Sequence, residues 1–281
     1  MTTKERAVLS LINFGKHFGA GCASCSDNRE GAMRQSYCPA CRTIYACSGI
    51  SLELYAGEVL GIVGESGSGK STLLRCLYFD EDATAGEAYL TGYKDGQVNV
   101  LTETAQQKRY IRNHHLGMVY QNPYHGLRMS FSATGNIAEK LIAAGSRSVG
   151  HMTARAATLL TKVEIPKYRF LDIPATFSGG MQQRVQIAKA LSNNPPILLL
   201  DEITTGLDLS VQAMVLDLIK GLQRELGISM IVVSHDLAVI RMLAERTIVM
   251  KNGRIIEQGL TDQVLEDPKH PYTQLLVQSL L

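Results

Sequence analysis

Residues 64–71 have the sequence GESGSGKS, which fits the pattern G-x-x-x-x-G-K-[ST] without a mismatch. The apolar run VLGIV (59–63) precedes it, and KSTLLRCL (70–77) follows with leucines at helical spacing, so the stretch should join a buried strand to a helix. Its glycines allow successive backbone N–H groups to turn inward around a phosphate, and the start of the helix adds a positive dipole end. A chance Gly/Ser turn would not explain the strand and the helix on either side.

The sequence therefore predicts a phosphate loop that binds a nucleotide. Lys70 should reach the β- and γ-phosphates, and the Ser71 hydroxyl should ligate Mg²⁺. The residues expected to contact the nucleotide are Gly64, Glu65, Ser66, Gly67, Ser68, Gly69, Lys70, Ser71 and Thr72.

Two further apolar runs predict more strands of the same sheet. PILLLDE (196–202) and SMIVVSHD (229–236) both end in polar or charged residues, and a helix is predicted between them over 210–226. Strands that alternate with helices predict a parallel sheet with right-handed crossovers. The apolar face of the intervening helix is predicted to comprise Val211, Met214, Val215, Leu218, Ile219 and Leu222. A hairpin that turns at Asn252-Gly253 is predicted over 246–259.

Asp201 and Glu202, at the end of the run ILLLDE, are the candidate catalytic carboxylates. Carboxylates at the C-terminal edge of such a strand face the phosphate loop in nucleotide-binding folds. Asp201 suits the holding of Mg²⁺, and Glu202 suits the polarisation of an attacking water. Taken alone, the pair could be a helix N-cap after a strand, but the phosphate loop makes that the weaker interpretation.

Three more motifs follow the phosphate loop in a defined order. They are YQNP with Gln121, FSGGMQQR with Ser178, Gly179 and Gly180, and VVSHD with His235. The order phosphate loop, Gln, Ser-Gly-Gly, Asp-Glu, His resembles that of the ATP-binding cassette (ABC) ATPases over nearly the whole chain. The resemblance implies an α/β ABC nucleotide-binding domain with a RecA-like parallel-sheet core, an antiparallel β subdomain and a helical subdomain.

The resemblance also implies roles for individual residues. Gln121 would sense Mg²⁺ and the γ-phosphate, and His235 would contact the γ-phosphate and act with Glu202 in catalysis. Ser178, Gly179 and Gly180 would complete the site of a partner protomer, and Asp208 would lie in the loop between the two sites. The implied chemistry is in-line hydrolysis of ATP, with Mg²⁺, across a head-to-tail dimer. The chain departs from the family pattern without loss of a charged catalytic group, at Phe177, Met181 and Ile203.

The same resemblance gives domain boundaries and an adenine-stacking residue. Residues 1–281 are expected to form a single ABC ATPase domain, with a helical subdomain over 122–180 and a cysteine-rich insert over 19–45. The family's stacking aromatic precedes the phosphate loop. Phe18 is the first candidate and Tyr45 the second, because the cysteines disturb the usual spacing.

Within the family, two branches compete. The ending with HPYT (270–273) resembles the peptide importers, whose members usually continue further with additional cysteines, whereas no Cys follows Cys76 here. The segments NPYHGLRMSFSATGNIAEKLIAAGSR and EIPKYRFLDIPATFSGG resemble instead the K-type ATP-binding proteins of the carbon–phosphorus lyase system. The implied function is an ATPase that docks on the lyase core complex, supports phosphonate breakdown and does not itself cleave the C–P bond.

The expected partners are a second protomer, either a copy of this chain or the L-type relative, and the lyase core complex. The alternative is the motor of a peptide, nickel or phosphonate importer; a translation regulator is a distant third, because such proteins carry two cassettes. The lack of an apolar run near ~18 residues and of a signal-peptide pattern predicts a cytoplasmic chain that does not enter the membrane. The net charge of +2 argues neither for nor against nucleic acid, and no nucleic acid is expected among the partners.

Cys22, Cys25, Cys38 and Cys41 form two Cys-x-x-Cys pairs separated by twelve residues. This spacing predicts a Cys₄ zinc knuckle, although the gap is slightly short of the usual range. The alternative is a flexible loop with four reduced thiols. Four protein ligands would leave zinc no open position, so the predicted role is structural. Cys47 and Cys76 lie in apolar surroundings and are predicted to be core residues.

Overall fold

The structure is a computed structural model that describes residues 7–23, 25 and 36–278. The chain divides into two compact units. The first comprises residues 1–55, 59–103 and 233–281, and the second comprises residues 56–58 and 104–232.

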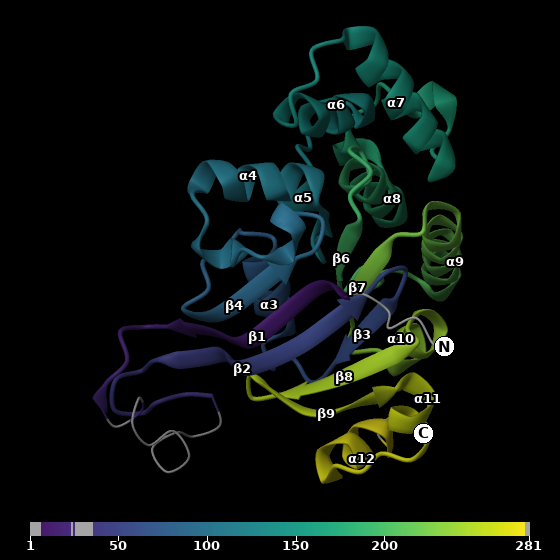
Figure 1. The fold of residues 1–281 in the computed structure, drawn as a ribbon. Helices are drawn as coiled ribbons and strands as arrows, with labels where there is room; N and C mark the ends of the chain where they lie inside the picture. The colour runs from purple at the N-terminus through teal and green to yellow at the C-terminus, as the bar shows by residue number, and fades with distance from the viewer. Residues whose placement is uncertain (1–6, 24, 26–35, 279–281) are drawn as a thin grey trace, which may run out of the picture. The chain divides into compact units, whose positions relative to one another are not determined.

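An antiparallel sheet of three strands lies in the first unit, in the order β2-β1-β4 (Figure 1). Leu9 and Leu11 of β1 point to the buried side and alternate with less buried residues, as expected of a strand with one face on the core. The last residue of β1, Phe18, pairs with the first residue of β2, Ile44. The strand bounds are Ala7–Phe18 for β1, Ile44–Tyr55 for β2 and Ala85–Leu90 for β4.

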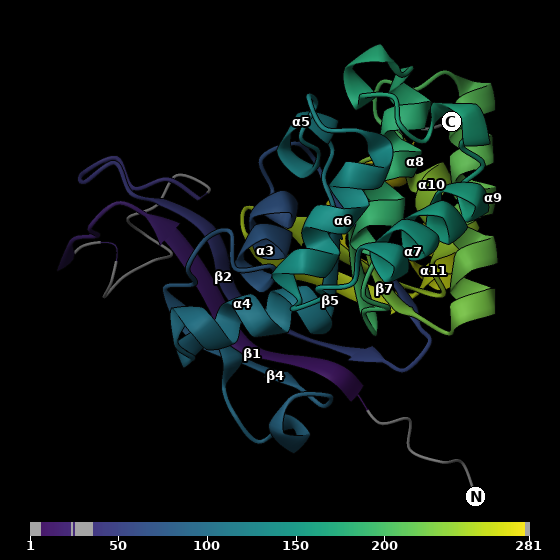
Figure 2. The same cartoon turned by 90° about the horizontal axis from the view of Figure 1, so that it is seen from above.

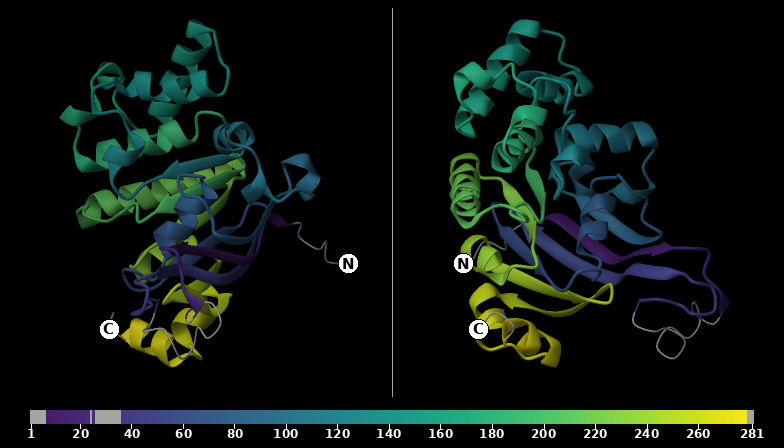
Figure 3. Two further views of the ribbon diagram at one scale, coloured as in Figure 1. Left: turned by 90° about the vertical axis from the view of Figure 1, so that its left-hand side faces the viewer. Right: turned by 180° about the vertical axis from the view of Figure 1, so that it is seen from behind.

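The first unit also contains β3, which is buried along its whole length. β3 pairs in parallel with β8, and β8 pairs antiparallel with β9. The β8–β9 hairpin turns at Asn252 and Gly253 as predicted, and both have positive φ (50° and 75°), which this tight turn requires. Figure 3 shows the two C-terminal helices (yellow) side by side. The elements are β3 Val59–Val63, α3 Lys70–Leu77, α10 Leu237–Leu243, β8 Arg246–Lys251, β9 Arg254–Leu260, α11 Thr261–Glu266 and α12 Pro271–Gln278.

The second unit has strands in the order β5-β6-β7 and most of the helices. β5 and β6 are parallel, and every residue of the three strands is buried, so a continuous apolar run encodes each one. Helices α6, α7 and α8 contact one another (Figure 2). The bounds are α4 Ala105–His114, β5 Leu116–Val119, α5 Pro123–Gly126, α6 Ala133–Ala143, α7 Val149–Lys162, α8 Gly179–Ala190, β6 Ile197–Asp201, α9 Leu209–Leu226 and β7 Ser229–Val233.

Helix α9 buries a slightly different face from the predicted one. Val215, Ile219 and Leu222 are buried as expected, but Met214 is half exposed and Leu216 is buried instead. The buried face of the helix is therefore rotated toward Leu216, and the side chain of Met214 is left half exposed to solvent. Between residues 122 and 180 the structure has helices and turns and no strand. None of the helices within the described ranges is long and apolar enough to span a bilayer.

Candidate functional site

The phosphate loop connects β3 to α3 in the first unit, as the sequence predicts. Gly69 precedes the helix with φ 102°, a left-handed conformation that favours glycine. A Cβ at Gly69 would lie 2.0 Å from the backbone oxygen of Ala46 on β2, so only glycine fits there. The N-terminal end of α3 is therefore held close to strand β2, and its first amides are available for an anion.

Lys70 is 3% exposed, and its ammonium group is held by the loop itself. Its Nζ donates to the carbonyl oxygens of Gly64 and Glu65 at 2.7 and 2.9 Å, and to Ser68 Oγ at 3.3 Å. These acceptors point the positive charge at the concave side of the loop. The lysine is preorganised to receive phosphate oxygens, which would exchange for neutral acceptors.

His235 belongs to the same unit and lies exposed just beyond β7. The preceding residue, Ser234, donates its backbone N–H to the Ile62 oxygen of β3 at 3.2 Å. The following residue, Asp236, caps α10 by accepting from Ala238 N at 2.8 Å. His235 is thus anchored on both sides next to the strand that leads into the phosphate loop.

The two predicted carboxylates lie in the second unit with Gln121. Asp201 is the last residue of β6 and is 1% exposed. Glu202 follows with a positive φ of 45°, an uncommon backbone conformation for a residue with a side chain. Its carboxylate accepts a hydrogen bond from Gln121 Nε2 at 2.9 Å and one from Thr205 Oγ1 at 3.3 Å. The structure therefore joins Gln121 and Glu202, which are 81 residues apart.

Gln186 of α8 was not identified from the sequence, yet it fixes the segment that carries Gln121. Its Oε1 accepts from Tyr120 N at 2.6 Å, and its Nε2 donates to the Tyr120 oxygen at 3.0 Å. A Cβ at Gly126 would lie 2.2 Å from Gln186 Oε1, so a larger residue there would displace the Gln186 side chain. In the sequence Gln186 is simply a glutamine after the FSGG motif, and nothing there indicates that its partner is Tyr120.

Ser178, Gly179 and Gly180 begin helix α8 in the second unit. Ser178 is the N-cap, and its Oγ accepts from Met181 N at 3.4 Å. A Cβ at Gly180 would lie 2.3 Å from Cγ1 of Val211, so this glycine permits close packing on the start of α9. Asp208, the N-cap of α9, accepts from Val211 N at 2.9 Å. The N-terminal ends of α8 and α9, which begin at Ser178 and Asp208, therefore pack against each other.

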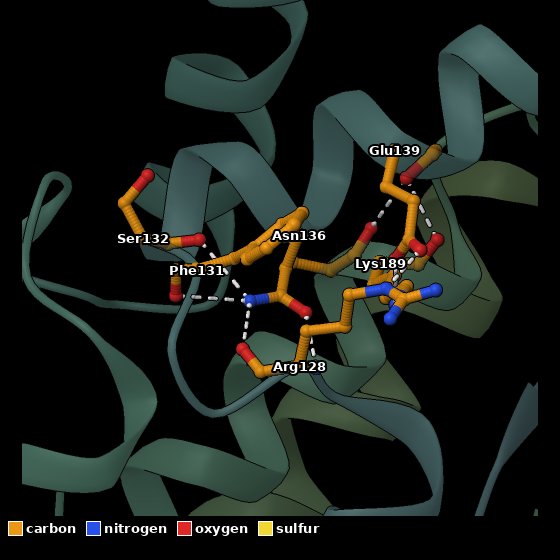
Figure 4. Close-up of polar contacts among 8 residues, drawn as sticks. Arg128, Phe131, Ser132, Asn136, Glu139 and Lys189 are labelled. Carbon is orange, nitrogen blue, oxygen red and sulfur yellow. Dashed lines mark hydrogen bonds and ion pairs between the residues drawn. The ribbon is translucent and has the colours of Figure 1, made fainter.

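The segment after Gly126 is held by the buried side chain of Asn136 (Figure 4). Asn136 Nδ2 donates to the backbone oxygens of Arg128, Phe131 and Ser132 at 3.0–3.2 Å, and its Oδ1 accepts from Arg128 N at 2.8 Å. The Arg128 guanidinium pairs with Glu139, and Lys189 Nζ reaches the other oxygen of Glu139 at 2.8 Å. Arg128 is therefore exposed on a rigid turn.

The two candidate stacking aromatics differ in their exposure to solvent. Phe18 is 40% exposed at the end of β1, and Lys16 Nζ lies 4.6 Å from its ring centroid. Tyr45 is 6% exposed, and its hydroxyl donates to Cys25 Sγ at 3.4 Å. Phe18 is therefore partly accessible at the surface, whereas Tyr45 is engaged with the cysteine cluster.

The four cysteines of the two pairs come together in the first unit. Their sulfur atoms all lie within 4.8 Å of one another, with Cys22–Cys25 and Cys25–Cys41 at 3.6 Å and Cys22–Cys38 at 3.9 Å. Disulfide sulfurs would be about 2.05 Å apart, so none of the four cysteines is in a disulfide. Four sulfurs around zinc, each at about 2.3 Å, would be separated by about 3.8 Å, so the cluster fits a tetrahedral Zn²⁺ site.

The surroundings of the cluster shift the thiol pKa values in both directions. A backbone hydrogen bond with Cys25 lowers the pKa of Cys22, but side-chain hydrogen bonds with the other sulfurs raise it further, to about 11. The Tyr45 hydroxyl lowers the pKa of Cys25, and the nearby Thr43 hydroxyl and backbone lower the pKa of Cys41 to about 6. Cys22 N donates to Cys25 Sγ at 3.2 Å. Metal-binding cysteines must lose their protons, and the contacts of Cys25 and Cys41 assist that loss. Cys47 and Cys76 are buried elsewhere, and burial raises the pKa of Cys76 to about 12, as expected of core thiols.

Comparisons with known proteins agree with the motifs. The model of a family described as "ABC transporter" matches residues 47–205. The "Putative phosphonates utilization ATP-binding protein PhnK" of Escherichia coli is 50% identical over 234 residues, 83% of this chain and 91% of that protein. The "Dipeptide transport ATP-binding protein DppF" of Escherichia coli is 37% identical over 98% of this chain and 77% of its own length.

A solved structure shows the same fold. The dimeric post-hydrolysis state of the ATP-binding cassette MJ0796, bound to ADP and Pi, is similar with a TM-score of 0.74 and 31% identity, over 90% of this chain and 98% of that one. The predicted nucleotide-binding fold is confirmed. The predicted site residues are divided between the units: the phosphate loop and His235 in the first, and Gln121, Ser178–Gly180, Asp201 and Glu202 in the second.

Proposed function

Because the chain belongs to the ABC transporter family of ATP-binding cassettes, we propose that it binds and hydrolyses ATP as a dimer and supports organic phosphonate catabolism with the carbon–phosphorus lyase complex. The 50% identity to a phosphonate utilization protein supports this role over the importer role, for which the dipeptide relative is 37% identical. The C–P bond itself would be cleaved by the lyase complex.

Each catalytic step falls to a residue whose contacts suit it. Lys70 binds the β- and γ-phosphates through the charge that the loop already orients. Ser71, Gln121 and Asp201 hold Mg²⁺, which neutralises charge on the phosphates when bound. Glu202 polarises the attacking water, and His235 contacts the γ-phosphate. The hydrogen bond from Gln121 to Glu202 holds the carboxylate in one orientation.

The dimer completes each site with the start of α8 from the partner protomer. Ser178 uses its Oγ to cap the helix, and Gly179 and Gly180 add backbone N–H groups without side chains. Such a helix start carries a partial positive charge that suits a γ-phosphate. The partner is a second copy of this chain or the L-type relative, and the site of action is the cytoplasm.

We also propose that Cys22, Cys25, Cys38 and Cys41 bind one structural Zn²⁺. The sulfur separations and the hydrogen bonds to sulfur support the metal, and four protein ligands leave it no catalytic position. Zinc would order a segment that has few apolar side chains to bury.

A growth experiment tests the lyase role. Cells that lack the chromosomal gene are supplied with this chain or with a Glu202→Gln variant and grown on a phosphonate as the only phosphorus source, with growth on phosphate as the control. Growth that depends on the wild-type chain, together with co-purification of the lyase core, supports the proposal. Normal growth on phosphonate without the chain, with failed peptide or metal uptake, would favour the importer.

A further inference from the structure

The segment His270–Thr273, with the sequence HPYT, contacts the phosphate loop through Tyr272. Tyr272 and its partner Glu65 are 207 positions apart in the sequence. The hydroxyl oxygen of Tyr272 accepts a hydrogen bond from the backbone N–H of Glu65 at 2.9 Å. Both residues belong to the first unit. The function proposed above does not use this contact.

Tyr272 is held in place by three neighbours. Pro271 begins helix α12, and His270 Nδ1 accepts from Tyr272 N at 3.0 Å, which fixes the first turn. Lys251 Nζ lies 4.3 Å from the centroid of the tyrosine ring. The hydroxyl is therefore presented by a side chain with little freedom to leave.

Glu257 of β9 anchors the chain just before the tyrosine. Its two carboxylate oxygens accept from Lys269 N at 2.7 Å and from His270 N at 3.0 Å. Burial raises the pKa of Glu257, but these backbone hydrogen bonds bring it below its usual range, so the anchor is charged. The HPYT segment is thus built onto the same hairpin, β8–β9, whose Gly253 N–H donates to Ser68 of the loop at 3.0 Å.

The contact fixes the peptide on which the catalytic lysine rests. Tyr272 occupies the N–H of the peptide between Gly64 and Glu65, and the carbonyl of that same peptide, from Gly64, accepts from Lys70 Nζ at 2.7 Å. The next carbonyl, from Glu65, accepts from Lys70 Nζ at 2.9 Å and from Ser68 N at 3.2 Å. The Glu65 residue itself is exposed, so without the tyrosine its N–H would bond to water and the turn would be less fixed. We infer that Tyr272 is a positioning residue for nucleotide binding, which holds the first turn of the phosphate loop in the shape that receives ATP.

Tyr272→Phe tests this inference because it removes only the hydroxyl and keeps the ring against Lys251. We expect the Kd for ADP and the KM for ATP to rise about three- to tenfold, the effect of one hydrogen bond, with kcat within about twofold. Tyr89→Phe is the matched control, since the Tyr89 hydroxyl donates to the Glu87 carboxylate at 2.8 Å in an exposed hydrogen bond on β4. His270→Ala should act in the same direction by a smaller factor.

A second measurement separates this inference from the proposed function. In a ¹⁵N-labelled protein, Tyr272→Phe should shift the Glu65 amide resonance and accelerate its hydrogen exchange, while Tyr89→Phe leaves both unchanged. Nucleotide binding by the wild-type chain is measured first and tests the proposed function alone. Unchanged Kd and KM in Tyr272→Phe, whether or not the Glu65 amide moves or the protein loses stability, would overturn the inference.

Discussion

Gln121 and Glu202 meet in the second unit through a 2.9 Å hydrogen bond from the glutamine amide to the carboxylate. Glu202 adopts a positive φ, and its carboxylate also accepts from Thr205. A strained backbone that directs a side chain at a fixed partner is a common feature of functional sites. The pair couples the residue proposed to sense Mg²⁺ to the residue proposed to act on water.

Glu202→Gln should separate binding from hydrolysis. The amide keeps the shape of the side chain but loses its negative charge, so kcat should fall by about 100-fold or more while ATP still binds. In ATP and Mg²⁺ the variant should accumulate as a dimer in size-exclusion chromatography. Turnover at the wild-type rate would remove Glu202 from its assigned role.

Lys70→Ala should impair both binding and hydrolysis. The substitution deletes the charge that the loop carbonyls orient toward the phosphates. Because charge-assisted hydrogen bonds contribute about 1.5–3 kcal/mol, the affinity for ADP should fall more than tenfold. Isothermal titration calorimetry measures it, and an affinity equal to that of Glu202→Gln would contradict the distinction between the two residues.

Gln186→Leu should destabilise the second unit and slow catalysis. The leucine would leave the Tyr120 N–H without its buried partner, at a cost of about 2–3 kcal/mol in the free energy of unfolding. Urea unfolding measures this cost. Gln106→Leu, at an exposed position of α4, serves as the control and should change stability by less than about 0.5 kcal/mol.

The purified chain should contain about one zinc ion, as measured by elemental analysis. Replacing Cys38 and Cys41 together with Ser should remove it, whereas Cys47→Ala should retain it because Cys47 lies outside the cluster. ADP binding should survive in both variants if the zinc is structural. A metal-free preparation with the same thermal stability as the zinc-loaded protein would rule out a structural role.

We propose that the exposed turn around Arg128 docks on the lyase core, so Arg128→Ala should weaken that docking about tenfold, the loss expected of an important interface arginine. Alanine is preferable to glutamate, since a carboxylate at 128 would face Glu139 and disturb the turn that Asn136 holds. Arg147→Ala is a control at another exposed arginine. Quantitative co-purification is the measurement, and equal losses in both variants would point to a general charge effect.

Local patterns were sufficient for the strands and turns that carry the nucleotide motifs. The apolar run 59–63 became β3, and Asn252-Gly253 became the hairpin turn, because neighbouring residues decide both outcomes. Family resemblance added Gln121 and His235, whose roles no local pattern reveals. It also ranked Phe18 above Tyr45 as the adenine-stacking residue, and that order stays a prediction.

Contacts between distant residues could not be predicted in the same way. Gln186 forms a hydrogen bond with Tyr120, 66 positions away in the sequence, and Tyr272 forms one with Glu65, 207 positions away. Each pair exists only because the tertiary fold brings two backbones together, and neither side chain has an unusual neighbourhood in the sequence. The buried face of α9 shifted for a related reason: its partners, rather than its own periodicity, decided that Leu216 and not Met214 is covered.

The direct pairing of Phe18 with Ile44 has a consequence for how this chain can be altered. The connection between β1 and β2 therefore begins and ends at one paired position, and closure entropy grows slowly, by only about 0.6 kcal/mol for each doubling of length. A connection of another length could be exchanged for this one at little cost to the pairing of the two strands, although the cysteine cluster would be lost with it.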